Sequence, residues 1–230
     1  MTDYTCEKCG EVFKKKRDYN RHGHLKKSCV KVKTYIDLFC GIGGFHQALN
    51  KLNCECVLAC DIDKHCRENY KLNYGVDPHP DVKLINPDDI SNTIDIICGG
   101  FPCQAFSNAG KKKTFSDDRG LLFDEIMRIA KAKKPKFMFL ENVKHILKVG
   151  DKKVIEYIRK RIEDHGYTLQ IFQISPHEYG VPQQRERVYF VCVRNDIYNG
   201  RDIELPEKVN DFKFEEFLTK KEDIDPKYFI

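Results

Sequence analysis

One cysteine of this chain stands where a reactive thiol is expected. The apolar run IDIIC (94–98) is followed by two glycines and then by FPCQ (101–104). An apolar run that ends in glycines is typical of a buried strand followed by a tight turn. A cysteine in a turn beyond a strand end is a candidate nucleophile. We therefore predict covalent chemistry at Cys103; the alternative is an ordinary buried cysteine.

Two further segments place charged groups beside predicted strands. Glu141-Asn142-Val143 follows the apolar run 137–140. Arg185 lies two residues before the run 187–193, and Arg187 is the first residue of that run. Ligands of open α/β sheets bind beyond the carboxyl ends of the strands, so we expect the Glu141 carboxylate on the same sheet edge as the cysteine. A surface ion pair at Glu141 and solvated charges at the two arginines are the alternatives.

A glycine-rich turn follows the first apolar run of the body. The segment DLFCGIGGF (37–45) contains glycines that let the backbone approach a ligand closely. Its spacing is not GxGxxG, which disfavours a dinucleotide site. Asp61 ends the next apolar run, 56–60, where it could bind a ligand or cap the helix that follows.

The N-terminus has a spacing of zinc ligands. Cys6 and Cys9 are separated by two residues, and His22 follows Cys9 after twelve. Phe13 and Tyr19 lie between them, where a small finger needs its core residues. A module of some 30 residues buries too little apolar surface to fold alone, and a tetrahedral zinc would supply the missing free energy.

The fourth ligand of such a site is open between two residues. Cys29 lies seven positions after His22, whereas His24 lies only two positions after it. We favour Cys29, which gives a Cys2HisCys set. The alternative is a disordered basic tail with incidental cysteines.

Strands and helices must alternate to position these groups. The alternation predicts an α/β layered sheet with crossover connections, and the continuous apolar runs indicate strands covered on both faces. The predicted strands are 35–39, 56–60, 94–98, 137–140, 169–175 and 187–193, and the predicted helices are 45–52, 64–73, 119–133 and 152–165.

Charge and composition divide the chain into three parts. Residues 1–33 hold ten Lys/Arg and four Asp/Glu, a net charge of +6, whereas the rest of the chain has a net charge of −1, so the total is +5. We predict a basic module over 1–33 that attracts phosphates, a globular body over 34–200 and a charged segment over 201–230. No apolar run approaches 18 residues, and the N-terminus has no apolar signal region. We therefore expect an intracellular protein, in the cytoplasm or nucleus and without a membrane segment, whose eleven cysteines stay reduced.

Taken in order along the chain, these segments resemble the cytosine-C5 DNA methyltransferase family. DLFCGIGGF is similar to the family's cofactor motif, GGFPCQAFS (99–107) to its nucleophile motif, ENV (141–143) to its acid motif, and GVPQQRERVYFV (180–191) to its arginine motif. DDRGLLFDEI (117–126) is similar to the segment between nucleophile and acid. The resemblance covers about residues 33–200 and implies a doubly wound, Rossmann-like α/β sheet that uses S-adenosylmethionine. Residues 1–33 resemble a Cys2His2 zinc finger with a longer last interval.

The resemblance implies methyl transfer from S-adenosylmethionine to C5 of a cytosine in double-stranded DNA. Cys103 would add to C6 of the ring, Glu141 would hold or protonate N3, Arg185 would bind near O2, and Arg187 would support the site and the phosphate backbone. The target base must leave the helix to reach the cysteine.

The resemblance also implies a set of cofactor contacts. Asp61 would bind the ribose hydroxyls, Ile62 would pack on the adenine, and Asp89-Ile90 would contact the adenine amine. The complete set is Asp37, Phe39, Gly41, Gly43, Asp61, Ile62, Asp89, Ile90 and Leu122.

Two parts of the family pattern are missing. Nothing after Val193 resembles the target recognition domain or the final Gly-Asn-Ser motif. A truncated enzyme, a degenerate remnant, and one half of a split enzyme with the missing parts on a second chain are the three explanations. Two other functions also stay open: a tRNA cytosine-C5 methyltransferase, and a non-catalytic zinc-finger nucleic-acid-binding protein with a degenerate methyltransferase fold.

Overall fold

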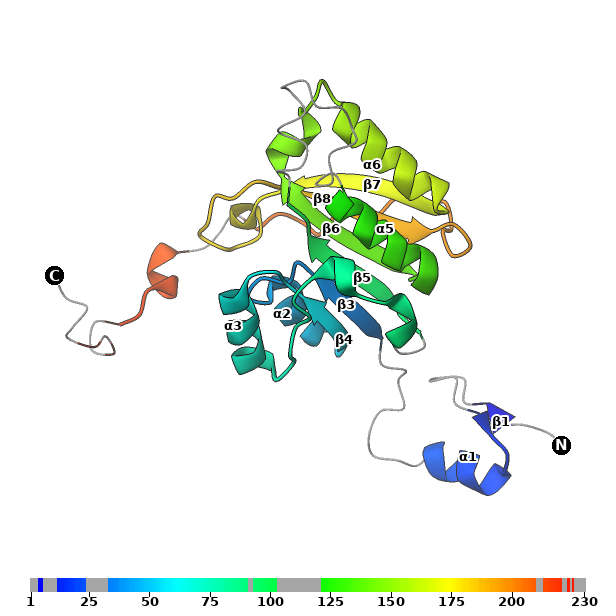
Figure 1. The fold of residues 1–230 in the computed structure, drawn as a ribbon. Coiled ribbons are helices and arrows are strands. Elements are labelled where there is room, and N and C mark those ends of the chain that lie inside the picture. Colours follow the sequence, from blue (N-terminus) through cyan, green and yellow to red (C-terminus); the bar gives the residue numbers. More distant parts are fainter. Residues whose placement is uncertain are drawn as a thin grey trace. The chain divides into compact units, whose positions relative to one another are not determined.

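The computed structural model describes residues 4–5, 12–23, 33–90, 93–102, 121–209, 213–220, 223 and 225, without the side chains of residues 5, 12, 21–23 and 121. The chain divides into two compact units, 1–99 with 132–136, and 100–131 with 137–230. Its architecture is α/β, with a mixed sheet of six strands. Figure 1 labels the elements of both units.

Three parallel strands form the centre of the first unit. β3 (Thr34–Leu38) pairs in parallel with both β4 (Glu55–Cys60) and β5 (Ile96–Gly100). Leu38 lies opposite Cys60 on one side and Gly99 on the other, so the three strands end at one edge. The predicted strands at 35–39, 56–60 and 94–98 are confirmed.

Two helices follow these strands. α2 (Gly44–Asn50) comes directly after the glycine-rich turn, and α3 (Lys64–Tyr74) follows β4. The carboxylate of Asp63 caps α3 by accepting the N–H groups of His65 at 2.7 Å and Cys66 at 3.0 Å. The capping role considered for Asp61 therefore belongs to Asp63. Two short 3-10 turns, η1 (Val82–Leu84) and η2 (Pro87–Asp89), complete the segment before β5.

The second unit contains three antiparallel strands and two helices. β8 (Arg187–Arg194) lies between β6 (Phe137–Val143) and β7 (Tyr167–Ile174) and is antiparallel to both. α5 (Leu121–Lys133) and α6 (Lys153–Asp164) lie side by side on one face of these strands (Figure 1). The Tyr157 hydroxyl of α6 donates to Asp124 of α5 at 2.6 Å and Arg161 pairs with the same carboxylate at 2.8 Å. The short turns of this unit are η4 (Lys144–Leu147), η5 (Pro176–Glu178) and η6 (Phe214–Phe217).

The last two predicted strands, 169–175 and 187–193, are confirmed, and they pair directly with each other. β7 and β8 are antiparallel neighbours. The connection between them contains Pro176, Gly180 and Pro182, which disfavour the crossover helix that parallel strands need. The strand expected to stop at residue 140 continues to Val143, because Glu141 pairs with Tyr189 and Asn142 with Val188 on β8.

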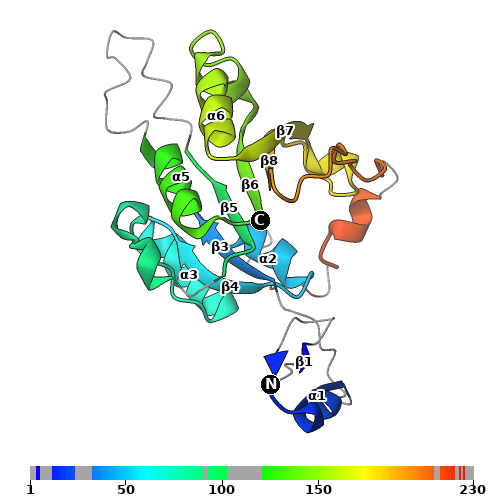
Figure 2. The ribbon, with the colours of Figure 1, turned by 90° about the vertical axis from the view of Figure 1, so that its right-hand side faces the viewer.

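The described N-terminal residues form a short hairpin followed by a helix (Figure 2). β1 (Tyr4–Thr5) pairs antiparallel with β2 (Val12–Phe13), and α1 covers Lys16–Gly23. The ring of Tyr19 meets that of Phe13 edge-on at 6.2 Å and lies 6.0 Å from that of Tyr4. Phe13 and Tyr19 therefore pack together, as their spacing predicted.

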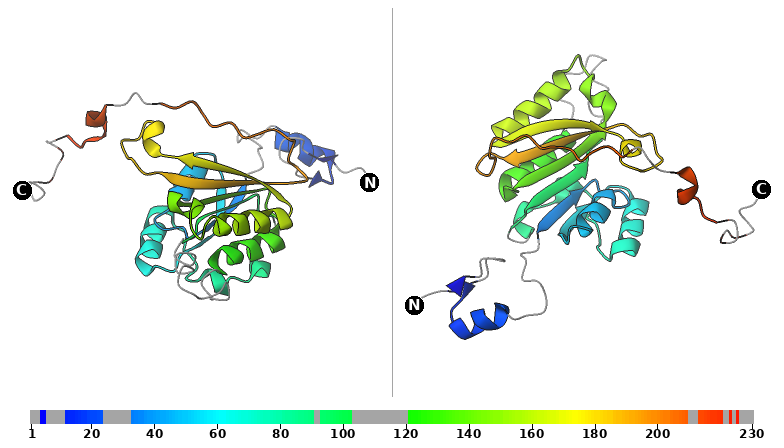
Figure 3. Two further views of the ribbon diagram at one scale, coloured as in Figure 1. Left: turned by 90° about the horizontal axis from the view of Figure 1, so that it is seen from above. Right: turned by 180° about the vertical axis from the view of Figure 1, so that it is seen from behind.

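Residues 201–209 run back beside β7 (Figure 3). The Ile203 N–H donates to the side-chain oxygen of Gln170 at 2.8 Å, and Val209 forms a parallel bridge with Tyr179. This part of the charged C-terminal segment is therefore attached to the second unit. Among the described helices, none combines the length and the apolar character that crossing a membrane requires.

Candidate active site

A carboxylate and a guanidinium meet on the second unit, where β6 pairs with β8. The register places Val143 opposite Arg187, so Glu141, two residues earlier, shares a face with Arg187. Arg187 Nε lies 2.7 Å from Glu141 Oε1, with side chains 18% and 25% exposed. Burial raises the pKa of Glu141, while the charges of Arg187 and Arg185 act in the opposite direction, and the net direction is upward. This carboxyl therefore keeps a proton more readily than a solvated glutamate does.

The backbone leading to Cys103 is attached to the same strand. The side-chain amide of Asn142, which is 2% exposed, donates to the carbonyl oxygen of Phe101 at 2.8 Å. A Cβ on Gly100 would lie 3.2 Å from Glu141 Oε2, so a glycine there leaves room for the carboxylate. Cys103 itself lies outside the described residues. Asn142 thus fixes the chain two residues before the predicted nucleophile.

Arg185 is held through its backbone. Its N–H donates to the Oγ of Ser175 at 3.0 Å, while its side chain is exposed. Ser175 is 3% exposed, and its Oγ also lies 2.8 Å from Nδ1 of His177. The hydroxyl therefore fixes the start of the segment that carries both arginines.

Sequence reasoning gave no role to Asn142 or Ser175. The sequence does contain a signal for Asn142, because it closely follows a long apolar run. Asparagine is uncommon in strands, so an asparagine at this place suggests a specific role. Ser175 and Glu178 form a capping box around Pro176. The spacing of a serine and a glutamate three residues apart is visible in the sequence. The hydrogen bond from Arg185, ten positions away, has no signal in the sequence.

The first unit holds most of the predicted cofactor residues. Phe39 and Gly41 have φ angles of 55° and 53° in the turn after β3, and Gly43 has a φ of 95° as the N-cap of α2. The Gly41 N–H donates to Asp61 Oδ2 at 2.8 Å, and the Asp63 N–H donates to Asp61 Oδ1 at 2.9 Å. Asp61 therefore joins the glycine-rich turn to the end of β4.

Other predicted cofactor residues differ in how accessible they are. Ile62 is 75% exposed beside Asp61, and Asp89 is exposed, but Ile90 is only 6% exposed. The Ile90 carbonyl accepts from Lys133 Nζ at 2.9 Å. Leu122 is half-buried on α5, in the second unit.

Asp37 lies in the core rather than at a surface. Its side chain is 0% exposed, and it accepts hydrogen bonds from the Tyr70 hydroxyl at 3.1 Å and the Cys98 thiol at 3.6 Å. Burial raises the pKa of Asp37 from 3.8 to about 7, the charge of Asp61 adds to the rise, and the two hydrogen bonds oppose it. Its carboxylate thus has partners within the protein, so a direct cofactor contact is not what this geometry favours.

The pKa of Asp37 predicts a pH-dependent stability. Between about pH 4 and pH 7 the folded chain holds a proton on Asp37 that the unfolded chain releases. The bound proton stabilises the folded state. This contribution to the free energy of unfolding is fully present below pH 4 and is lost as pH rises through about 7. Urea unfolding measures the free energy of unfolding of both proteins from pH 4 to pH 8. Over this range the free energy of unfolding of wild type should fall by on the order of 4 kcal/mol relative to that of Asp37→Asn. A difference between the two proteins that does not vary with pH would contradict the raised pKa.

The predicted zinc ligands fall mostly outside the described residues. Cys6, Cys9 and Cys29 are not described, and His22 lies on α1 without a described side chain. Among the residues that are described, no group of three or more His, Cys, Asp or Glu could hold a metal ion. The zinc site remains a prediction.

Comparisons with known proteins match most of this chain to one family. Residues 33–226 match the family model of C-5 cytosine-specific DNA methylases. Type II methyltransferase M.HhaI of Haemophilus parahaemolyticus is 41% identical over 172 residues, which make up 75% of this chain and 52% of that protein. Type II methyltransferase M1.ScrFI of Lactococcus lactis subsp. cremoris is 45% identical over 177 residues, 74% of this chain and 44% of that protein.

A solved structure agrees with the sequence comparisons. The fold superimposes on a mutant of DNMT2 from Spodoptera frugiperda with a TM-score of 0.68 and 26% identity, over 85% of this chain and 61% of that one. The chain spans about half the length of the curated relatives it matches. Because the family model covers most of the chain, this protein belongs to the C-5 cytosine-specific DNA methylase family.

Proposed function

We propose that this chain carries the catalytic groups for transfer of a methyl group from S-adenosylmethionine to C5 of cytosine in DNA. The observation that carries the proposal is the Glu141–Arg187 pair beside the segment that leads to Cys103. Arg187 Nε is 2.7 Å from the carboxylate, and Asn142 of the same strand holds the Phe101 carbonyl at 2.8 Å. An acid and its positioning cation thereby lie beside the described segment that leads to the proposed nucleophile.

Each of these groups has a definite task. The thiolate of Cys103 adds to C6 of a flipped cytosine, and the electrons of the C5–C6 double bond move so that C5 becomes nucleophilic. Glu141 gives a proton to N3 as negative charge develops there, and burial, which raises the pKa of Glu141, favours the protonated form that this step needs. Arg187 keeps the carboxyl in place. After methylation, loss of the C5 proton restores the double bond and breaks the bond between C6 and sulfur.

The first unit suits S-adenosylmethionine, which when bound supplies an electrophilic methyl group. The fit rests on the glycine-rich turn: a Cβ on Gly41 would meet no atom within 4 Å, so the space beside this backbone is open. Asp61 stands at the edge of the same turn as an acceptor for ribose hydroxyls, and Ile62 next to it offers an exposed apolar side chain. Phe39, Gly43, Asp89 and Ile90 are the further proposed contacts in this unit, and the contact predicted for Leu122, which belongs to the second unit, stays a prediction.

Substrate choice is tested directly by labelled methyl transfer. The purified chain is incubated with radiolabelled S-adenosylmethionine and either cytosine-containing duplex DNA or tRNA. Label in DNA that is recovered as 5-methylcytosine supports the proposal. Label in tRNA alone would support the tRNA methyltransferase, and cofactor binding without transfer to either substrate would support the non-catalytic alternative.

We expect Asp61→Ala to weaken binding of S-adenosylhomocysteine by about tenfold or more. The variant loses an acceptor for the ribose and also the hydrogen bond that holds the Gly41 N–H. Isothermal titration calorimetry gives the dissociation constants. Asp77→Ala is the matched control, because Asp77 is exposed and pairs with Lys71 near the C-terminal end of α3. Equal affinity in wild type and Asp61→Ala would place the ribose contact elsewhere.

The basic N-terminal module is proposed to bind one zinc ion through Cys6, Cys9, His22 and Cys29. The hairpin, the helix and the packing of Phe13 on Tyr19 support a finger-like module. Metal analysis should give about one equivalent of zinc per chain, and Cys6→Ser should lose it while the circular dichroism of the α/β body stays unchanged. Full zinc content in Cys6→Ser would refute the site, and full content in Cys29→Ser would point to His24 or a water molecule as the fourth ligand.

A second chain that supplies target recognition remains a proposal as well. Specific readout of DNA needs contacts to base edges in addition to phosphate attraction. If this chain works with such a partner, methylation by this chain alone should be slow, salt-sensitive and poorly selective for sequence. Robust, sequence-specific methylation by this chain alone would contradict the need for a partner.

A further inference from the structure

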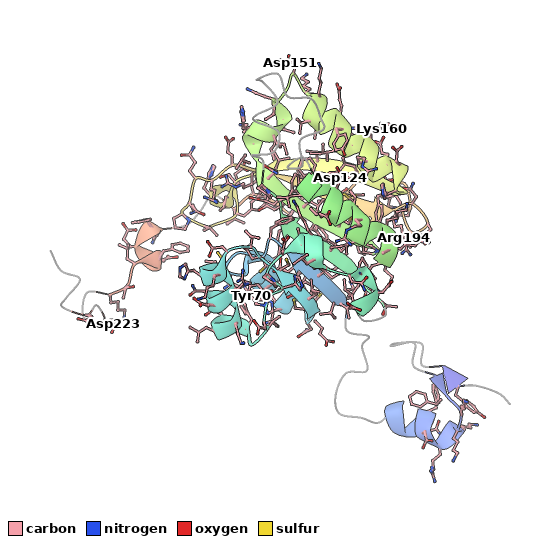
Figure 4. The ribbon with its side chains drawn as sticks, viewed as in Figure 1. Tyr70, Asp124, Asp151, Lys160, Arg194 and Asp223 are labelled. Atoms are coloured by element: carbon pink, nitrogen blue, oxygen red, sulfur yellow. The ribbon has the colours of Figure 1, made fainter. Side chains whose placement is uncertain are left out.

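A buried cluster of polar side chains lies beneath the glycine-rich turn and has no part in the chemistry described above. Its centre is Tyr70 of α3, which is 0% exposed and labelled in Figure 4. The phenol donates to Asp37 Oδ2 at 3.1 Å and lies 2.7 Å from Nδ1 of His46 on α2. His46 is 9% exposed, so all three groups are shielded from water.

The hydroxyl of Tyr70 connects three side chains of this cluster. When it donates to Asp37, the contact at 2.7 Å is satisfied by the His46 tautomer whose Nδ1–H donates to the phenol oxygen. The Cys56 thiol also lies 3.7 Å from this oxygen. Two hydrogen bonds thus run in sequence from imidazole to phenol to carboxylate. A buried network whose members are satisfied in this way favours one packing over its alternatives.

Tyr74, one turn further along α3, connects this cluster to the glycine-rich turn. Its ring stacks on His46 with centroids 3.9 Å apart and planes at 25°, and it meets the Tyr70 ring at 4.9 Å. Its hydroxyl donates to the carbonyl of Gly43 at 3.3 Å. A Cβ on Gly43 would lie 2.2 Å from Tyr74 Cε2, so the backbone rests directly on the ring.

The glycine-rich turn is therefore held from two sides. Asp61 holds the Gly41 N–H, and Tyr74 holds the Gly43 carbonyl. Between β3 and these anchors, Phe39 has a φ of 55°, a conformation that costs energy in a residue other than glycine. Such a conformation persists only where the surrounding structure supports it, and Tyr70 and Tyr74 provide part of that support.

We propose that Tyr70 and Tyr74, held by Asp37 and His46, are positioning residues that fix residues 39–43 in the conformation that binds S-adenosylmethionine. The identity of the cofactor rests on the proposed function; the support of the turn rests on the contacts above. The cluster explains why a fully buried carboxylate stands in the segment that resembles a cofactor motif. Asp37 orients Tyr70 and has no need to touch the cofactor.

Tyr70→Phe tests the proposal, because it removes the hydroxyl and keeps the ring. Hydrogen–deuterium exchange of the amides in residues 39–46 should become about tenfold faster, and the affinity for S-adenosylhomocysteine should fall by about tenfold. The kcat at saturating S-adenosylmethionine should stay within about twofold of wild type, because the loss concerns cofactor binding. Tyr74→Leu, which removes the ring beneath Gly43, should have the larger effect on both exchange and affinity.

Tyr157→Phe is the matched control. It removes the same kind of hydrogen bond, from a tyrosine to Asp124 at 2.6 Å, within the second unit. Exchange in residues 39–46 and cofactor affinity should stay at wild-type values in this variant. Unchanged exchange and affinity in Tyr70→Phe would overturn the proposal, as would an equal loss in Tyr157→Phe. If wild type itself fails to bind S-adenosylhomocysteine, the proposed function fails, and the exchange rates alone decide whether Tyr70 holds the turn.

Discussion

Cys103→Ala is expected to reduce methyl transfer to cytosine by at least about 10³-fold, the largest single effect in this chain. Without the thiolate, nothing adds to C6, and C5 stays too weak a nucleophile to accept the methyl group. The measurement is single-turnover transfer of labelled methyl to duplex DNA, because single turnover separates chemistry from product release.

Binding provides the control for this variant. Cys103→Ala should bind S-adenosylhomocysteine as wild type does, because the proposed cofactor turn and Asp61 belong to the first unit, whereas the segment leading to Cys103 belongs to the second. A variant that retains a tenth or more of wild-type turnover would show that the chemistry uses another nucleophile.

Glu141→Gln is expected to slow methyl transfer by about 10²- to 10³-fold, in the range that general acids contribute. The amide keeps the shape of the side chain and can donate a hydrogen bond, but it has no proton to give to N3. Because burial raises the pKa of Glu141, wild-type activity should decline as pH rises through that pKa, and this limb of the profile should disappear in the variant. Rates from about pH 5 to pH 9 give both results.

Glu163→Gln is the matched control for this substitution. Glu163 is exposed on α6 and lies 3.6 Å from Arg159 in a solvated ion pair. Its loss should change neither the rate nor the pH profile. A Glu141→Gln variant that keeps the wild-type profile would remove Glu141 from the role of acid.

The strands of the first unit could be predicted from the sequence because each is a continuous apolar run that ends in a recognisable turn. β3 is buried almost throughout, and Gly41 and Gly43 after it adopt positive φ angles. The residue types after β3 and β4 therefore identified the edge of the sheet where Asp61 lies.

The arrangement of the second unit was harder to predict, because pairing direction and long-range hydrogen bonds leave little trace in local sequence. Glu141 and Asn142 look like loop residues, yet they continue β6 because β8 pairs with them. Asp37 gives the clearest case. It stands in a segment that resembles a cofactor motif, but its partner Tyr70 is 33 positions away, so its burial could not be read from its neighbours.

The central claim, that Cys103 attacks C6 of cytosine in DNA, is tested most directly with duplex DNA that contains 5-fluorocytosine. Fluorine cannot leave as the C5 proton does, so the enzyme and the DNA should remain joined after methyl transfer. The account predicts a denaturation-resistant adduct with wild type and S-adenosylmethionine, whose cross-linked peptide contains Cys103, and no adduct with Cys103→Ser. An adduct that persists in Cys103→Ser, or that maps to another residue, would contradict it.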